Sequence, residues 1–240
     1  MAANINQARI TKECGYYVPG EKVENLLANS KFSVGYLIAA EAIPPNHCPI
    51  QGTISMYEMA NGVFGLMTNN HVMPRIDPQF VCGSIINFKG FGQLVLTPHD
   101  IRCVTTSAEL DATVIELTDK CVSTLKQRNA QFLKITSAQL GNQVAMVQYP
   151  NGEFSFDKGI IHDINGYILH YYIAGDPGSS GSPILLWDLR AIGLHSGRVS
   201  DNDKEILGSM RIATHLPDIV TFHLKSFESR NSAIMYVFDR

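Results

Sequence analysis

A serine lies between glycines in the turn GSSGSP, residues 178–183, directly before the apolar run ILL. In this G-x-S-G-x-P pattern the glycines leave the backbone around Ser180 bare, so that a substrate carbonyl can approach its hydroxyl. Gly178 can adopt backbone conformations that most residues avoid, and its amide could join that of Ser180 in an oxyanion hole. The turn therefore predicts Ser180 as a nucleophile, with an ordinary β-turn entering a strand as the alternative.

A serine hydroxyl is a weak nucleophile on its own, so Ser180 needs a base and an acid that orients this base. His71 follows the apolar stretch VFGLMTNN and is expected at the end of a strand. Asp111 opens the stretch DATVIEL, where a carboxylate could be buried and directed at an imidazole. Asp100, in an expected loop, and Asp119, after the end of that strand, are alternatives for the acid. The order His71, Asp111, Ser180 is that of a serine-protease triad.

Several segments carry a resemblance to the chymotrypsin-like (trypsin-like) serine proteases. MTNNHV resembles their T-x-x-H-V stretch, LDATVIEL their D-x-A-hydrophobic segment, and GSSGSPIL their G-x-S-G-x-P segment. AIGLHSG is similar to the strand that follows the nucleophile, and VQYPNGEFSFDKGII to a hairpin found in bacterial and intracellular members. The likeness covers roughly residues 31–220. Its pattern is closest to disulfide-free members, such as glutamyl endopeptidases and high-temperature-requirement proteases.

The resemblance implies a serine endopeptidase that acts on polypeptides through an acyl-enzyme. In this reading Ser180 attacks, His71 transfers the proton, Asp111 holds the His71 tautomer, and the amides of Gly178 and Ser180 bind the oxyanion. Secretory members have an aspartate directly before the nucleophile, which pairs with an N-terminus created by cleavage. Ser179 stands at that position here, and no activation sequence is visible. The resemblance therefore implies a protease that needs no such cleavage.

The residues expected to line the substrate pocket leave its preference open. His195, Ser196 and Gly197 follow the nucleophile, and Ala174 and Gly175 precede it. In glutamyl endopeptidases and picornaviral cysteine proteases, a histidine at the place of His195 contacts an acidic or glutamine side chain. Those relatives usually have Thr or Ser where Gly175 stands, so a bulky apolar side chain is also admissible. A preference for Lys or Arg is disfavoured, because Ala174 occupies the position of the acidic pocket residue.

Three other functions compete with this interpretation. The first is a catalytically silent, protease-like module that binds peptides or recruits partners. The second is a viral-type processing protease, which would use the same chemistry. The third, an α/β-hydrolase, is excluded because its nucleophile elbow is G-x-S-x-G, and the residue two after Ser180 is Ser182. The chain also lacks the alternating strand–helix pattern of that fold.

The sequence pattern predicts an all-β fold for the part of the chain that must position these residues. The pattern predicts two six-stranded Greek-key β-barrels packed together, with a short N-terminal extension and a C-terminal helix. The expected domains are an extension over residues 1–30, a protease domain over 31–220, and a helix and tail over 221–240. Within the protease domain, barrel one covers about 31–117 and barrel two about 132–215. Helices are expected over Glu21–Asn29 and in the tail from Leu216 to Arg230.

Composition excludes several partners. The chain has 240 residues, of which 45% are hydrophobic and 17% charged, and its net charge is −3. No basic face is therefore expected for nucleic acid, and no apolar run is long enough to cross a membrane. The five cysteines are widely spaced and form no CxxC pair, so no metal site and no cofactor are expected. Together with the lack of a signal-peptide pattern, this predicts an intracellular, cytoplasmic protein with reduced thiols.

Overall fold

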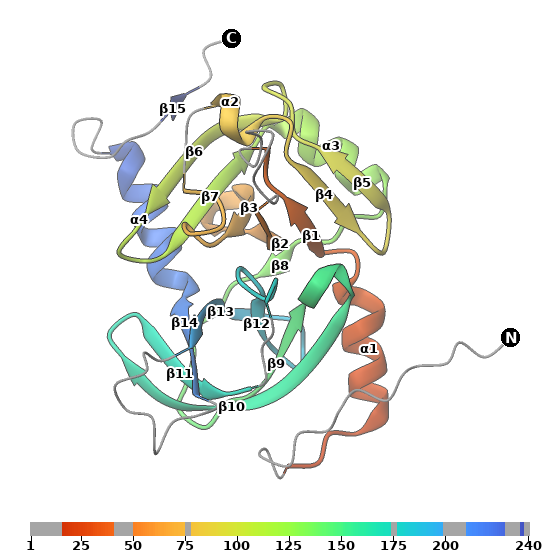
Figure 1. Ribbon diagram of the computed structural model, residues 1–240, viewed down its shortest axis with the longest axis vertical. Coiled ribbons are helices and arrows are strands. Elements are labelled where there is room, and N and C mark those ends of the chain that lie inside the picture. Colours follow the sequence, from red (N-terminus) through yellow and green to blue (C-terminus); the bar gives the residue numbers. More distant parts are fainter. Residues whose placement is uncertain are drawn as a thin grey trace, which may run out of the picture.

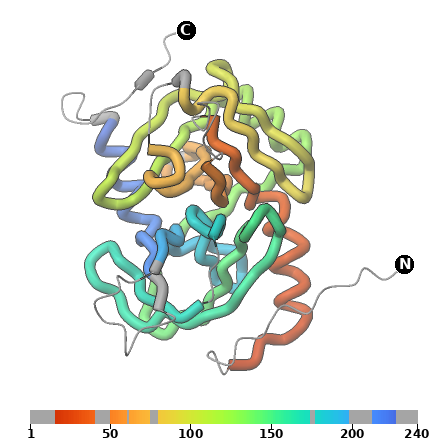
Figure 2. The backbone as a smooth tube through the Cα atoms, in the orientation of Figure 1, coloured from red at the N-terminus to blue at the C-terminus, as the bar shows by residue number. Residues whose placement is uncertain are grey.

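The chain folds into two β units that stack along the long axis of the molecule and are flanked by helices (Figure 1). The structure is a computed structural model, and it describes residues 16–40, 50–74, 78–173, 177–198, 210–228 and 236–237. The trace in Figure 2 passes from the first unit to the second after β8, which ends at residue 134. No helix in the described part of the chain is both long and apolar enough to span a membrane.

The second unit is a closed six-stranded barrel, as the sequence predicts. Its strands follow the order β10-β11-β14-β13-β12-β9, and every neighbouring pair is antiparallel. Side chains that alternate along the strands fill its interior, among them Val144, Met146, Ile161, Leu169 and Ile184. The strands are β9 (Gln143–Gln148), β10 (Ser155–Asn165), β11 (Ile168–Tyr172), β12 (Pro183–Leu186), β13 (Ala191–Arg198) and β14 (Met210–His215).

The first unit differs from the expected six-stranded barrel, because it is an open sheet of nine strands. Eight strands follow the order β15-β6-β7-β3-β2-β1-β4-β5, and β8 pairs with β2. The two ends of this order are β15, which pairs with β6, and β5, which pairs with β4, and among the described residues no strand pairing joins these ends. The strands are β1 (Val34–Ile38), β2 (Gln51–Glu58), β3 (Phe64–Thr68), β4 (Ile85–Phe88), β5 (Gly92–Val95), β6 (Ile101–Ser107), β7 (Ala112–Leu117), β8 (Leu133–Lys134) and β15 (Tyr236–Val237).

Helices lie outside both units. Helix α1 (Gly20–Ser30) confirms the helix expected over Glu21–Asn29. Helix α4 (Leu216–Glu228) begins at the first residue of the predicted helical tail, so the expected domain boundary at residue 221 falls inside it. Helix α3 (Asp119–Gln127) forms in a stretch expected only to interrupt the β pattern. A short helix α2 (Pro78–Val81) and two 3₁₀ turns, η2 (Ala60–Gly62) and η3 (Pro150–Gly152), complete the set.

The two units share a buried apolar core. Val34, Tyr57 and Met67 from the first unit pack in one cluster with Val147 and Leu194 from the second. All five side chains are fully buried, at 0% exposure. Burial of apolar area at this level is the main favourable term in packing one unit on the other. The core therefore fixes the strands of one unit relative to those of the other, which the site described next requires.

Candidate active site

His71 and Asp111 form the first half of the site. His71 lies in the turn that follows β3, and Asp111 directly precedes β7, which pairs with β3. The His71 Nδ1 atom lies 2.9 Å from Oδ2 and 3.0 Å from Oδ1 of Asp111. The His71 amide also donates to Asp111 Oδ1 at 3.0 Å. The carboxylate thus holds both the backbone and the ring of His71, and it leaves Nε2 free to act as a base.

Asp111 takes up a backbone conformation that few residues adopt. Its φ is +45°, in the left-handed region where Asp and Asn are enriched among the non-glycine residues. The side-chain amide of Asn69 donates to the Asp111 carbonyl at 2.9 Å and supports this turn. The sequence suggests a buried carboxylate, but 26% of the Asp111 side chain is exposed. For the His71 side chain the exposed fraction is 48%. The pair therefore lies at the surface, where a peptide can reach it.

The backbone of Ser180 contacts the first unit near the start of β2. The Thr53 amide donates to the Ser180 carbonyl at 2.8 Å. A Cβ atom added at Gly52 would lie 2.8 Å from Val72 and 3.1 Å from the Ser180 carbonyl oxygen. Gly52 thus lets the nucleophile turn and the residue after His71 approach the same point of β2. Within the described part of the chain, the Ser180 hydroxyl makes no hydrogen bond to His71, and such bonds often tighten only when substrate binds.

The glycines on either side of Ser180 are required by the backbone. Gly178 has φ +95° and Gly181 has φ +84°, conformations that other residues rarely adopt. A Cβ at Gly178 would lie 2.9 Å from the Tyr149 carbonyl oxygen, and one at Gly181 would collide with the Thr53 carbonyl. Among the described residues, no acceptor takes a hydrogen bond from the amides of Gly178 and Ser180. The sequence assigns these two amides to an oxyanion hole, and this assignment stays a prediction.

The family assignment follows from a match to the family model of the trypsin-like peptidase domain. The match spans residues 60–194, more than half of the chain, and it includes His71, Asp111 and Ser180. The chain belongs to the trypsin-like peptidase family. It is a serine endopeptidase by family, as the sequence predicts. A sequence search among curated proteins gave no significant match.

Solved structures of proteases share the fold of this trypsin-like peptidase. Rv3671c from M. tuberculosis, in an inactive form, is 14% identical with a TM-score of 0.60, and the match covers 88% of this chain and 95% of that one. The HtrA-type protease AlgW, solved with a decapeptide, is 13% identical with a TM-score of 0.62, over 86% and 67% of the two chains. A serine endoprotease from Yersinia pestis is 13% identical with a TM-score of 0.62, over 91% and 70%.

The expected pocket residues of this peptidase follow the nucleophile on β13. His195 is buried, with 4% exposure, and its Nδ1 atom lies 2.6 Å from the Tyr171 hydroxyl. Its backbone carbonyl accepts from the Gly181 amide at 3.0 Å. Ser196 Oγ accepts from the Asn69 side chain at 3.3 Å, and a Cβ at Gly197 would meet no atom within 4 Å. The other two predicted pocket residues, Ala174 and Gly175, lie outside the described residues.

Two further serines, Ser179 and Ser182, flank the turn that holds Ser180. The Ser179 hydroxyl is buried and donates to the Gln148 side-chain oxygen at 2.5 Å, across to β9. The Ser182 hydroxyl is also buried, and it has no hydrogen-bond partner in the described part of the chain. In the peptidase, the residue directly before Ser180 is thus held by a side chain of the same barrel.

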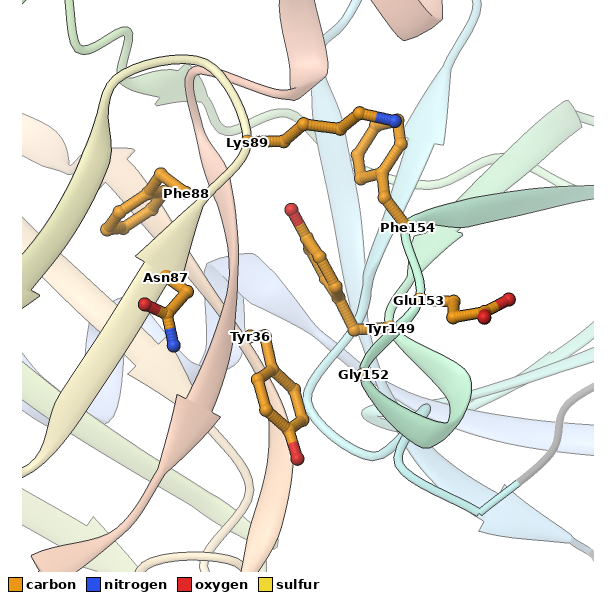
Figure 3. A pocket seen from close by; sticks show the side chains of 8 residues that line it. All are labelled: Tyr36, Asn87, Phe88, Lys89, Tyr149, Gly152, Glu153 and Phe154. Atoms are coloured by element: carbon orange, nitrogen blue, oxygen red, sulfur yellow. The ribbon is translucent and has the colours of Figure 1, made fainter. Parts of the chain in front are cut away.

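An open pocket of about 570 Å³ lies at the junction of the two units (Figure 3). Its lining side chains come from β1, from the β4–β5 turn and from the loop between β9 and β10. The Lys89 amine lies 5.3 Å from the centre of the Phe154 ring at its rim. The same loop supports the nucleophile turn, because the Asn151 amide donates to the Pro177 carbonyl at 3.2 Å. The pocket is lined by Tyr36, Asn87, Phe88, Lys89, Tyr149, Gly152, Glu153 and Phe154.

Four residues at this site were not found from the sequence: Thr53, Asn69, Gln148 and Tyr171. Asn69 is fully buried, and its side chain joins the Asp111 turn of one unit to Ser196 of the other. Its position two residues before His71 could have drawn attention to Asn69, because a buried side-chain amide nearly always forms hydrogen bonds. The other three lie within ordinary strand patterns, and no local signal separates them from other polar strand residues.

Proposed function

We propose that this trypsin-like peptidase cleaves polypeptides with Ser180 as nucleophile, His71 as general base and acid, and Asp111 as the residue that orients His71. The contact of 2.9 Å between His71 and Asp111, beside the turn that holds Ser180, carries the proposal. Because Asp111 accepts from Nδ1, the neutral imidazole presents the lone pair of Nε2 toward the cleft. The family match over all three residues supports the same roles.

The reaction runs in two halves. Ser180 Oγ attacks the scissile carbonyl carbon while His71 Nε2 takes the hydroxyl proton, and a tetrahedral oxyanion forms. The amides of Gly178 and Ser180 stabilise this oxyanion. Collapse breaks the C–N bond, His71 gives its proton to the leaving amine, and an acyl-enzyme remains. A water molecule then attacks the ester with His71 again as base, and release of the acid restores the Ser180 hydroxyl.

The chain needs no activating cleavage in this proposal. Ser179 replaces the aspartate that would pair with a new N-terminus, and Gln148 already holds its hydroxyl. The positive φ of Gly178, with its amide unpaired among the described residues, supports a turn that is competent without processing. The described cysteines Cys82, Cys103 and Cys121 are free thiols, which supports a reducing, cytoplasmic location.

The proposed substrate has a side chain other than Lys or Arg before the scissile bond. His195, Ser196 and Gly197 offer no carboxylate to pair with Lys or Arg. The Tyr171 hydroxyl on Nδ1 of His195 fixes the ring orientation and supports a polar role for it in the pocket. Glutamine or glutamate would contact this histidine, and a bulky apolar side chain is the second candidate, because residues 174 and 175 are small in the sequence.

A peptide-library cleavage profile tests both parts of the proposal. The wild type and Ser180→Ala are incubated with the library, and new N-termini are identified by mass spectrometry. We expect cleavage by the wild type alone, with glutamate, glutamine or bulky apolar residues enriched before the cut. Enrichment of Lys or Arg would contradict the pocket assignment while leaving the triad intact. Equal cleavage by Ser180→Ala would contradict the triad.

A further inference from the structure

Three side chains of the types that bind transition metals meet inside the first unit, away from the candidate active site. Cys103 comes from β6, Glu116 from β7 and His223 from α4. Glu116 lies near the end of β7, whereas Asp111 directly precedes its start. All three are buried, with exposures of 0%, 4% and 0%. One ligand atom from each lies within 4.8 Å of the other two.

The distances among these atoms fit one small ion. Glu116 Oε2 lies 3.7 Å from Cys103 Sγ and 3.3 Å from His223 Nε2. A tetrahedral zinc with bonds of about 2.3 Å to sulfur and about 2.0–2.2 Å to nitrogen and oxygen separates its ligands by about 3.6 Å (S to O) and about 3.4 Å (N to O). The observed spacings agree with both values, so an ion between the three atoms would need little movement.

Two of the three candidate ligands, His223 and Glu116, also have the outer partner that metal ligands usually have. His223 Nδ1, the nitrogen facing away from the cluster, lies 2.8 Å from the Thr105 hydroxyl. The other oxygen of Glu116, Oε1, lies 3.2 Å from the Arg102 guanidinium. Such partners fix the tautomer of a ligating histidine and the orientation of a ligating carboxylate. A divalent ion would balance the charges of a Cys103 thiolate and the Glu116 carboxylate.

We propose that Cys103, Glu116 and His223 bind a zinc ion that fastens helix α4 to strands β6 and β7. Binding forms a sulfur–zinc bond, and the Cys103 thiol proton leaves to solvent. The described residues supply three ligands, so a water molecule completes the tetrahedron. The ligands are far apart in the sequence, at positions 103, 116 and 223, and form no local motif. For this reason the cysteine spacing predicted no metal site.

The site is placed to stabilise the fold. In Figure 1, α4 starts beside β14 of the barrel and runs along the side of the molecule toward β6 and β7. Zinc at Cys103, Glu116 and His223 would therefore connect the two units through this helix. Its loss is expected to lower the thermal midpoint, and the proposed roles of His71 and Ser180 do not depend on it.

Cobalt(II) reports directly on the thiolate. Purified full-length protein is freed of metal with a chelator and titrated with CoCl₂ alone. We expect a thiolate-to-cobalt charge-transfer band that saturates at one ion per chain and disappears when an equivalent of ZnCl₂ is added. Elemental analysis of protein purified without chelator should then give about one zinc per chain. A folded protein without this band, or without a rise in thermal midpoint on adding zinc, would overturn the proposal.

Variants of the proposed ligands test whether the ion binds at Cys103 or at another cysteine. Cys103→Ser and His223→Gln should each weaken cobalt binding at least about tenfold and remove the zinc-dependent rise in midpoint. Cys121 is also a buried thiol, on α3, so Cys121→Ser is the matched control. It should keep both the cobalt binding and the zinc-dependent rise in thermal midpoint. If Cys103→Ser does not fold, a protein with Cys14, Cys48 and Cys82 changed to serine serves instead. Persistence of the band there supports the site, and its loss contradicts it.

A hydrogen-bonded cluster without metal is the alternative that these measurements separate. In that case Cys103→Ser would change the stability by the same amount with and without zinc, and no charge-transfer band would appear. A band lost in Cys121→Ser but kept in Cys103→Ser would place the ion elsewhere. Either result would contradict the assignment of Cys103, Glu116 and His223.

Discussion

The Thr53 hydroxyl donates a hydrogen bond of 3.0 Å to the carbonyl of Gly178. The same hydroxyl accepts from the Tyr149 amide at 3.2 Å, and the Thr53 amide donates to the Ser180 carbonyl at 2.8 Å. The Thr53 carbonyl in turn accepts from the Thr68 hydroxyl at 2.9 Å. A fully buried residue of the first unit thus fixes the turn of the second unit that carries the proposed nucleophile. It acts as a positioning residue for Ser180 and Gly178.

Replacing Thr53 by valine keeps the shape of the side chain and removes the hydroxyl. The Gly178 carbonyl then loses the hydroxyl that donates to it, so the proposed oxyanion donors are held less precisely. We expect kcat to fall about 10–100-fold with little change in KM, because the misplacement affects the transition state more than binding. Steady-state kinetics on a peptide from the cleavage profile measures both constants. Thr53→Ser should restore kcat, and failure of this rescue would contradict a role for the hydroxyl.

Gly178→Ala tests the role of the proposed oxyanion turn, and Gly141→Ala, at another glycine with positive φ, is the control. Both Gly178 and Gly141 have positive φ, +95° and +78°, but only a Cβ at Gly178 meets a backbone atom, at 2.9 Å. Alanine at either site costs roughly 1–2 kcal/mol in backbone strain. We expect Gly178→Ala to lower kcat/KM by at least about 10², while Gly141→Ala lowers only the thermal midpoint. Equal loss of activity in both variants would point to general destabilisation.

The proposed triad predicts effects that do not add. His71→Ala and Ser180→Ala should each lower turnover by on the order of 10⁶, and Asp111→Ala by somewhat less. The double variant of His71 and Ser180 should be no slower than either single variant, because both residues serve one proton transfer. Single-turnover assays at saturating substrate measure these rates. Additive losses would show that the two side chains act in separate steps.

Alkaline pH should destabilise the protein through a buried thiol on α3. Burial, with the Asp100 carboxylate nearby, raises the pKa of Cys121 to about 12. In the unfolded chain a thiol ionises near pH 8.5, so the proton is held more tightly in the folded state. The stability from this group is complete below about pH 8.5 and falls as pH rises toward 12. Denaturant unfolding at pH 8, 9 and 10 should show a smaller decline in the free energy of unfolding for Cys121→Ala than for the wild type. Equal declines in the two proteins would contradict this prediction.

The proposed nucleophile and its partners each have a local signal in the sequence. Ser180 lies in a glycine turn before an apolar strand, and His71 and Asp111 lie at the boundaries of apolar segments, in the order of a serine-protease triad. The barrel could be predicted because apolar residues alternate along its strands and turns separate them. The helix over Glu21–Asn29 follows in the same way from a local pattern.

The remaining features depend on contacts between distant parts of the chain. Strand β6 was not predicted, because polar residues such as Arg102 and Thr106 interrupt its apolar alternation. The open first sheet depends on which strands occupy its edges, which no single segment encodes. Thr53 is an ordinary strand residue until the fold brings Gly178 to it, and the same holds for Cys103 and His223. Tertiary contact creates these features, so the sequence pattern alone does not contain them.

Covalent labelling with a fluorophosphonate tests the central claim most directly. The hydroxyl of a serine that is activated by a base and an oxyanion hole attacks the phosphorus of the reagent and displaces fluoride, whereas ordinary serines react far more slowly. We predict one adduct per chain on the folded wild type, located at Ser180 by peptide mass spectrometry. The adduct should be absent from Ser180→Ala and strongly slowed in His71→Ala. A folded wild type that takes no label, or labelling that persists unchanged in Ser180→Ala, would contradict the account.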